Sequence, residues 1–407
     1  MPTRLLDLDL NQPLPDLVDL GEYDRLTVIA WKGRVPLGLI HLPDNGRTVT
    51  AEALARVLKE FLGETVLNGV SEDSESPLPA FSGAGGPRIS VIIPTRGRTS
   101  LVQGCLEAIR AQTYPPHEVL VVDNDPPDAS TWTLLSEQYR EVHYVMEPAR
   151  GVRFARNRGL MESRGEVVAF TDDDCRPEPD WLKIIAMAFA ARPGLGCVTG
   201  PVLPRELETR AQELLEARCG FIQGFNRKLF LPHPVKDFDP AFLLQTWRFG
   251  AGSNMAFRRE ALEELGYFDE TMLAAEDLEM FYRILRGGRE LAYEPGAVVR
   301  QRHTCSYAQM RRRMFEWGWG YASCLTKVIR YDSRYRRRAL AEMATWLWAY
   351  QVRGRIWPRL RGRGDTSYPL NLMLMEFWGA LAGVPGYFLG LQRARRQGSY
   401  EEVYPPE

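Results

Sequence analysis

Cysteine and histidine are scarce in this chain, with six and five among its 407 residues. No two cysteines form a C-x-x-C pair, so the clustered spacing of a structural zinc site is absent. A chain of this length does not need disulfide bonds to stabilise its core. We therefore expect reduced cysteines and a cytosolic protein.

Long apolar runs are missing from the first 300 residues, which excludes a membrane-spanning helix there. The N-terminus, MPTRLLDLDLNQPLPDL, lacks a basic start followed by an apolar stretch, and we expect no secretory signal. The composition, 45% hydrophobic and 25% charged, is typical of a globular protein. The length predicts two or three domains.

The net charge of −1 conceals a strong asymmetry. Residues 300–396 contain 19 Lys and Arg but only 5 Asp and Glu, and the remainder has an acidic excess. A basic region beside an acidic body predicts an anionic partner, which could be a membrane surface, a nucleic acid or an anionic polymer. No helix-turn-helix, RRM or zinc-finger pattern accompanies the charge, so we expect no nucleic-acid partner.

Composition and periodicity divide the chain into four parts. Residues 1–70 predict a small α+β accessory domain, with two strands within 26–40 around Lys32-Gly33 and a helix over 51–62. Its expected apolar face comprises Leu54, Val57, Leu58 and Phe61. Residues 71–87, SEDSESPLPAFSGAGGP, have linker composition. Residues 88–305 predict an α/β domain, and residues 306–407 a basic, aromatic helical region.

Strands alternate with helices from residue 88 onward. Short apolar runs at 89–93, 118–122 and 166–170 predict buried strands of a parallel sheet. In such sheets ligands bind at the carboxyl ends of the strands. Those ends carry Thr95-Arg96, Asp123 and the run Asp172–Asp174, so polar groups are expected to meet at one edge.

The aspartate run has two interpretations. Three adjacent carboxylates repel one another, and a divalent cation such as Mg²⁺ or Mn²⁺ would offset that repulsion while bridging to a phosphate. Strand alternation would point Asp172 and Asp174 towards one site and Asp173 elsewhere. The alternative is a solvated acidic loop, but the position after a buried strand favours a site.

A second acidic pair, Glu276-Asp277, begins a predicted helix. Two acidic residues at a helix N-terminus can have the purely structural role of stabilising the positive end of the helix dipole. Alternatively, one of them acts as a general base that removes a proton from an acceptor hydroxyl. His303 ends a strand-like run; a lone histidine is more often structural, but it would complete the metal site if that strand lies beside the aspartates.

Four segments together resemble the family 2 glycosyltransferases of the GT-A fold over residues 88 to about 305. They are ISVIIPTRGR, EVLVVDNDPPD, GVRFARNRGLMESRGEVVAFTDDDCRPEPDWL and GAGSNMAFRREALEELGYFDETMLAAEDLEMFYRILRGG, in the family's order. The resemblance implies an inverting transfer of sugar from a UDP-, GDP- or dTDP-sugar to an acceptor hydroxyl by direct displacement, with Mn²⁺ or Mg²⁺. Its products would be glycans, polysaccharides or glycolipids.

The resemblance also implies roles for individual residues. Asp277 would be the catalytic base, supported by Glu276. Asp174 would ligate the metal together with Asp172 and His303. The donor would be bound by Pro94, Thr95, Arg96, Asp123, Arg153, Asn157, Asp172 and Asp173. The second strand ends Asp123-Asn124-Asp125-Pro126 where the family usually has Asp-Asp-Gly-Ser, which leaves the nucleotide base open, and Gln301 stands where relatives often have a second histidine.

The stretch from Pro369 to Leu391 is the most apolar in the chain. Glu376, Pro385 and several glycines argue against a spanning helix. Apolar, aromatic and arginine-rich helices suit a membrane interface, so we expect peripheral attachment to the inner face of the cell membrane, where a glycan or lipid-linked acceptor would be available. The alternative is a helical subdomain that packs on the catalytic core.

Two other functions remain open from the sequence. A nucleotidyltransferase that makes sugar nucleotides would also use acidic metal ligands on a parallel sheet, but its Gly-rich phosphate loop should stand where this chain reads PTRGR. A non-catalytic sugar-nucleotide sensor or membrane scaffold would not need both the aspartate run and Glu276-Asp277.

Overall fold

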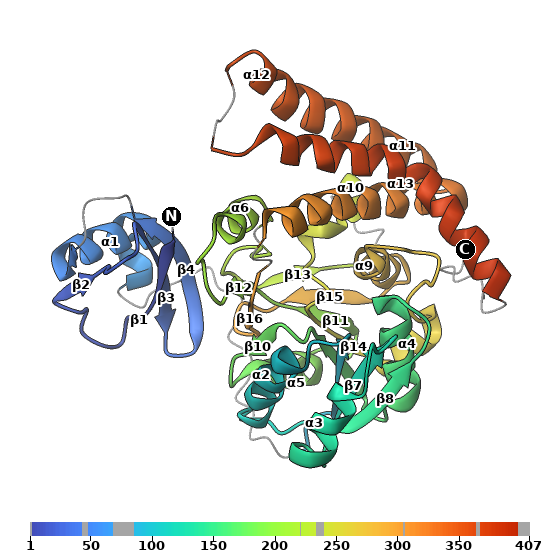
Figure 1. Cartoon of the computed structure of the whole chain (residues 1–407), viewed down its shortest axis with the longest axis horizontal. Coiled ribbons are helices and arrows are strands. Elements are labelled where there is room, and N and C mark those ends of the chain that lie inside the picture. Colours follow the sequence, from blue (N-terminus) through green and yellow to red (C-terminus); the bar gives the residue numbers. More distant parts are fainter. Residues whose placement is uncertain are drawn as a thin grey trace.

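The computed structural model describes residues 2–42, 48–67, 85–219, 221–232, 240–303, 306–363 and 367–397. Along the chain an N-terminal α+β unit is followed by a large α/β part and then by long helices (Figure 1). Most of the predicted linker, residues 71–84, lies outside the described residues. The limits of the domains therefore stay a prediction.

The N-terminal unit contains the expected hairpin and helix. Strand β1 (Thr3–Asp9) lies parallel to β3 (Arg25–Lys32), and β3 turns at Gly33 into the antiparallel β4 (Val35–Leu42). Two short strands, β2 (Leu17–Asp19) and β5 (Thr48–Thr50), precede α1 (Ala51–Leu67). Leu54 and Leu58 are buried, but the prediction for Phe61 was wrong: its side chain is 65% exposed, and Leu62 packs on the core instead.

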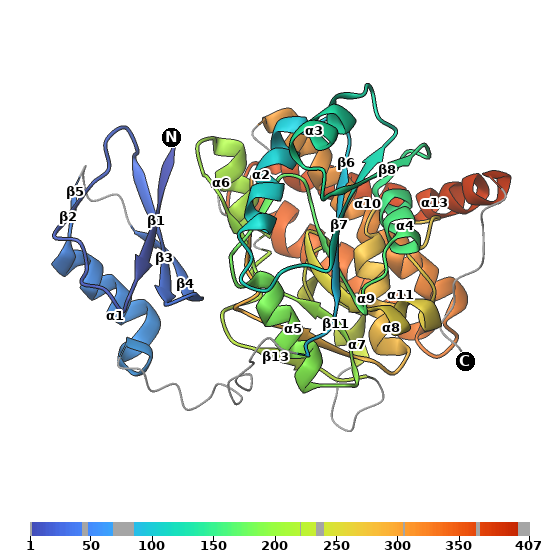
Figure 2. The ribbon, with the colours of Figure 1, turned by 90° about the horizontal axis from the view of Figure 1, so that it is seen from below.

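This unit packs against the α/β part near α6 (Figures 1 and 2). The Thr3 amide donates to the Leu207 carbonyl at 2.9 Å. Arg300 bonds to Asp7 at 2.8 Å, and its guanidinium lies 5.3 Å from the centre of the Trp31 ring. The first unit thereby contacts the strand that leads to the predicted metal site.

The α/β part is built on an eight-stranded sheet, ordered β13-β15-β11-β14-β9-β6-β7-β8. The strands β9, β6, β7 and β8 run parallel, and β14 is antiparallel to both of its neighbours. The bounds are β6 Ile89–Thr95, β7 Glu118–Asn124, β8 His143–Glu147, β9 Val167–Thr171, β11 Leu195–Thr199, β13 Lys228–Phe230, β14 Asn254–Arg258 and β15 Glu290–Tyr293. The predicted mostly parallel α/β sheet is confirmed.

Helices cover both faces of this sheet, because the residues that its central strands direct to each face are mainly apolar. Ile92 of β6 faces a core shared with α4 (Val152–Glu162), α8 (Arg259–Leu265) and α9 (Glu276–Arg286). Val91 and Ile93 face the other core, shared with α2 (Thr99–Arg110), α3 (Ser130–Gln138) and α5 (Trp181–Ala191). Each such buried side chain contributes about 1.5–3 kcal/mol, so the sheet is a rigid platform for the groups at its edge.

A small second sheet lies beside the aspartate run. In it β16 (Val299–Gln301) pairs with β10 (Cys175–Pro177) on one side and with β12 (Val202–Pro204) on the other. The register sets Gln301 opposite Cys175. Residues about 125 positions apart in the chain are therefore neighbours here.

The C-terminal region is helical, as predicted. Ser306 caps α10 (Tyr307–Tyr331), since its hydroxyl accepts a hydrogen bond from the Gln309 amide. Next come α11 (Arg336–Ala344), a π-helical segment (Thr345–Ile356), α12 (Trp357–Leu360) and α13 (Leu370–Gln397). Tyr321 and Leu325 of α10 join the core under α9, and α13 lies along α10 (Figure 1).

Glycines of α13 allow its close approach to α10. A Cβ atom on Gly379 would lie 2.0 Å from the Phe315 carbonyl oxygen, and one on Gly383 would lie 2.4 Å from that of Trp319. The helix also continues through Pro385. In the described part of the chain α13 is the one helix long and apolar enough to cross a membrane, yet one of its faces is packed on protein.

Candidate active site

The predicted strand-end residues meet at one edge of the sheet. Thr95 and Asp123 are partners in the register of β6 and β7, and β9 adjoins β6 on its other side. The Thr95 hydroxyl donates to Asp173 Oδ2 at 2.7 Å. The end of β6 thus touches the aspartate run directly.

The three aspartates point in different directions from those that strand alternation predicts. Strand β9 ends at Thr171, and the chain then turns so that the Cys175 amide donates to the Asp172 carbonyl at 3.1 Å. Asp173 and Asp174 both form ion pairs with Arg98. Asp172 faces Arg156, with 3.6 Å between their nearest charged atoms.

Burial is the largest influence on the pKa of Asp172 and of Asp173. It raises the pKa of Asp172, against the lowering effect of Arg156. It also raises the pKa of Asp173 to about 7, although Arg98 and Thr95 stabilise the charged form. The guanidinium groups of Arg98 and Arg156 supply two positive charges to a cluster of three carboxyl groups, so the cluster still favours binding of a cation. A divalent cation with oxygen ligands fits that deficit.

The structure does not bring His303 to the aspartates. Its Nε2 atom forms a hydrogen bond with Glu216 at 2.9 Å. Gln301, two residues earlier at the end of β16, donates from Nε2 to Asp174 Oδ1 at 3.0 Å. Among the described residues no three His, Cys, Asp or Glu side chains form a metal-binding group. The predicted trio with Asp172 and Asp174 is not assembled, because the register puts the glutamine beside the run.

The residues assigned to the nucleoside line the ends of β6 and β7. Asp123 is fully buried, and burial raises its pKa while the Thr131 and Tyr144 hydroxyls lower it. Arg96 is more exposed and pairs with Asp125 at 3.0 Å. Pro94 is buried within β6. Asn124 bonds to the Gly151 amide at 2.8 Å, which holds the start of α4 against this edge.

Helix α4 holds the loop that leads to the second acidic pair. The Asn157 side chain donates to the Phe268 carbonyl and accepts from the Phe268 amide, both at 2.9 Å. Arg153 Nε donates to the Glu270 carbonyl at 2.7 Å. The prediction placed both side chains on the donor. In the structure both side chains bind this loop, and their contact with the donor stays a prediction.

Glu276 and Asp277 differ in environment although they are adjacent. Glu276 is buried, and burial raises its pKa despite an ion pair with Arg156 at 2.6 Å. Asp277 is half-buried, and its Oδ2 accepts a hydrogen bond from the Gly252 amide at 2.8 Å. The preceding residue, Ala275, has a φ of 63°, a strained conformation for alanine that sets the direction of α9.

Arg156 joins the two acidic groups and was missed in the sequence. One guanidinium contacts Asp172 at 3.6 Å, Glu276 at 2.6 Å and the Gly252 carbonyl at 3.1 Å. The helical spacing of GVRFARNRG places it on the same side of α4 as Arg153 and Asn157. This spacing is the feature of the sequence from which Arg156 could have been predicted as a site residue. The aspartate run and the Glu276-Asp277 pair thus belong to one site.

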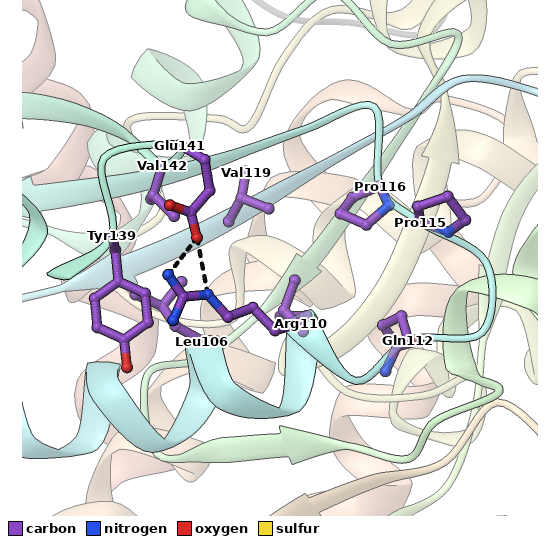
Figure 3. Close-up of a pocket in the computed structure, with 10 residues that line it drawn as sticks. Leu106, Arg110, Gln112, Pro115, Pro116, Val119, Tyr139, Glu141 and Val142 are labelled. Atoms are coloured by element: carbon purple, nitrogen blue, oxygen red, sulfur yellow. Dashed lines mark hydrogen bonds and ion pairs between the residues drawn. The ribbon is translucent and has the colours of Figure 1, made fainter.

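A separate pocket lies at the other edge of the sheet (Figure 3). Arg110 bonds there to Glu141 at 2.8 Å, and its guanidinium lies over the Tyr139 ring at 4.1 Å. The pocket reaches Val119, at the start of β7, which is roughly 13 Å along the strand from Asp123 at its end. It is not part of the candidate active site.

The fold is of the GT-A class, with a mostly parallel sheet and an acidic run at the carboxyl ends of its strands. Residues 90–266 match the model of the family described as Glycosyl transferase family 2. This part of the chain belongs to that family. The expected family and fold are therefore confirmed.

Several known proteins are similar to the chain. It is 25% identical to the pre-mycofactocin glycosyltransferase of Mycobacterium tuberculosis over 67% of this chain and 54% of that protein. It is 26% identical to the O-antigen chain rhamnosyltransferase RfbN of Salmonella typhimurium over 57% of this chain and 71% of that protein. A structure of the mannosyltransferase PcManGT from Pyrobaculum calidifontis, in complex with GDP-Man and Mn²⁺, aligns over 80% of both chains with 22% identity and a TM-score of 0.46.

The chain spans only part of the length of the first curated relatives that it matches. It spans about half the length of the mycobacterial protein and 34% of the uncharacterized protein y4gI of Sinorhizobium fredii, to which it is 25% identical.

Proposed function

We propose that the protein is an inverting glycosyltransferase that moves a sugar from a nucleotide-sugar donor to an acceptor hydroxyl. The observation that supports this best is the position of Arg156, which contacts both Asp172 at the strand end and Glu276 at the start of α9. A donor-side group and an acceptor-side group must lie this close for a direct displacement, because attack and departure take place at the same sugar carbon.

The donor binds at the carboxyl edge of the sheet. Thr95, Arg96 and Asp123, with Pro94, contact the nucleoside, and Asp172 lies near the ribose. Asp174, with Asp172, would hold a Mn²⁺ or Mg²⁺ ion, which would neutralise charge on the departing diphosphate. His303 has no place in this proposal, since it is bonded elsewhere in the fold. The nucleotide base of the donor to be tested is uracil, guanine or thymine.

Asp277 removes the proton from the acceptor hydroxyl as that oxygen attacks the opposite face of the sugar. The Gly252 amide orients its carboxylate. Glu276 is paired with Arg156 and buried, so it positions α9 rather than receiving the proton. No covalent intermediate forms, because the acceptor oxygen replaces the diphosphate oxygen in one step.

The acceptor belongs to glycan, polysaccharide or glycolipid synthesis, and the chain works at the inner face of the cell membrane. The relative RfbN acts, by its name, on O-antigen chains, which supports a role in the cell envelope. The nineteen basic residues between 300 and 396 suit an anionic surface.

The general base is tested by Asp277→Asn, with Glu263→Gln on the exposed side of α8 as the matched control. We expect Asp277→Asn to lower the transfer rate by about 10²–10⁴-fold while the thermal stabilisation by the nucleotide sugar is retained. Glu263→Gln should match the wild type in both measurements. Normal turnover by Asp277→Asn would refute the assignment of the base.

A further inference from the structure

Helix α13 exposes a continuous apolar face. The side chains concerned are 38–57% exposed. They are Trp378, Leu381, Val384, Phe388 and Leu389. At 100° per residue these positions lie within an arc of about 140° on one side of the helix. Large apolar side chains gathered in this way, in contact with solvent, mark a binding surface. We call it the α13 apolar face.

The opposite side of α13 packs against the rest of the protein. Its glycines lie against α10, and Gly390 packs so closely on the loop before α9 that a Cβ atom there would be 2.1 Å from the Thr271 carbonyl oxygen. Glu376 is buried and forms ion pairs with Arg218 and Arg355, both at 2.8 Å. To cross a bilayer the helix would have to break these contacts, so the exposed face alone is available to a partner.

The charges around the α13 apolar face are positive. Arg393, Arg395 and Arg396 are exposed in the last turns of the helix. Glu376 is the one acidic residue between 370 and 397, and it is buried. An apolar face that ends in arginines fits the boundary between acyl chains and anionic headgroups. A second copy of this chain would bring an equal excess of positive charge and fits less well.

The neighbouring helical segment exposes the same kinds of side chain. Trp348, Trp357 and Leu360 are exposed, with Arg361 stacked on the Trp357 ring at 4.5 Å. Tryptophan with arginine is characteristic of the membrane–water interface. The helices α12 and α13, which extend away from the sheet in Figure 1, therefore both expose apolar and aromatic side chains beside arginines.

We propose that the α13 apolar face, with Arg393, Arg395 and Arg396, binds the surface of an anionic lipid bilayer, with the helix lying along the surface. This inference rests on the proposed function, for which it names the surface that presents the acceptor. Through Gly390 the lipid-bound helix contacts the loop that leads to Asp277. The acceptor side of the active site is thereby attached to the element that touches the bilayer.

The test is flotation of the full chain with lipid vesicles. Vesicles of phosphatidylcholine with roughly one third phosphatidylglycerol are compared with phosphatidylcholine alone at low and high salt. We expect binding to the anionic vesicles that salt weakens. The double variant Trp378→Ser/Phe388→Ser should bind at least about tenfold more weakly. Arg393→Gln/Arg395→Gln/Arg396→Gln should lose the preference for anionic lipid. Trp132→Ser, at an exposed tryptophan of α3, is the matched control and should bind as the wild type does.

Outcomes that overturn the proposal are distinct from failure of the proposed function. Absence of vesicle binding by the wild type, or equal binding by Trp378→Ser/Phe388→Ser, would overturn it. So would a wild-type dimer that becomes monomeric in that variant without any lipid binding, because the face would then join two copies. Stabilisation by nucleotide sugars is measured on the same proteins without lipid. It should be unchanged in every variant, and its absence in the wild type would count against the donor site alone.

Discussion

Arg156 is the residue on which the site depends most. Its guanidinium is buried between Asp172, Glu276 and the Gly252 carbonyl, so three elements share one positive charge. Such a group acts in two ways. It opposes the rise that burial causes in the pKa of Glu276, and it holds Asp172 and Glu276 close together.

Replacing Arg156 with Gln should therefore affect stability and transfer together. A buried carboxylate left without its partner costs about 3–5 kcal/mol, which should appear as a lower melting temperature. Transfer should fall by about tenfold or more beyond the loss of folded protein, because Glu276 and Asp172 are no longer held together. The control is Arg158→Gln on the same helix, whose exposed pair with Glu162 is worth at most about 1 kcal/mol. If both variants had the same small effect, Arg156 would not be the link.

Single residues also show where the sequence was insufficient. Strand alternation predicted that Asp172 and Asp174 face one site, but β9 ends at Thr171 and the run forms a turn instead. His303 was expected at the metal because it ends a strand, yet pairing of β16 with β10 puts Gln301 beside Asp174. Local periodicity does not show where β9 ends in a turn, which decided the first outcome, or how distant strands pair, which decided the second.

At the scale of elements, α10 and α13 behave as one unit. The glycines of α13, which argued against a membrane-spanning helix in the sequence, bring its backbone against that of α10. The helix thus has two surfaces suited to binding, one lined by glycines and the other by large apolar side chains. The first surface packs against α10, and the second remains exposed.

Gly379→Ala should destabilise the protein even though alanine favours helix. The added methyl group would lie 2.0 Å from the Phe315 carbonyl oxygen, so the two helices must separate. Overpacking of this kind costs about 1–3 kcal/mol, which outweighs the gain of about 1 kcal/mol in helix propensity. Thermal unfolding compares this variant with Gly194→Ala, where the nearest atom would be at 3.7 Å. A rise in melting temperature for Gly379→Ala would contradict the close packing.

Glu376 gives α13 an acid-sensitive attachment. Burial acts to raise its pKa, but Arg218 and Arg355 outweigh it, and the pKa lies below its ordinary value. A depressed pKa means that the contribution to stability is present above the unfolded pKa, near 4.5, and is lost as the pH falls through the lower folded value. We expect the difference in melting temperature between wild type and Glu376→Gln to shrink steadily below about pH 4.5. A difference that stays constant down to pH 3 would contradict this pairing.

At the scale of the whole molecule, the N-terminal unit and the C-terminal helices both pack on the α/β part. The alternation of strands and helices was sufficient to predict the mostly parallel sheet and the meeting of Thr95, Asp123 and the aspartate run at the strand ends, because those follow from short-range pattern and general topology. The packing of the N-terminal unit against β12 and β16, through Arg300 and Trp31, could not be predicted, since it depends on side chains almost 300 residues apart. The same holds for the ties between α10 and the loop before α9.

The molecule's organisation gives each part a task. In the proposed function the sheet edge binds the donor and α9 carries the base, and the C-terminal helices pack on the loop before α9. Lys327 of α10 bonds to Asp269 in that loop and to Glu279 of α9, inside the protein. Binding of α13 to a membrane would then place the acceptor side of the site at the lipid surface without any change of fold.

The most direct test of the donor site is thermal unfolding with UDP-, GDP- and dTDP-sugars, with and without Mn²⁺, for the wild type and Asp174→Asn. Binding at about 100 times Kd adds roughly 2.7 kcal/mol, a shift of several degrees. We predict that one class of nucleotide sugar stabilises the wild type only with the metal, and that Asp174→Asn loses this effect. Stabilisation that is identical without metal, or unchanged in Asp174→Asn, or absent for every nucleotide sugar, would contradict the proposed glycosyltransferase site.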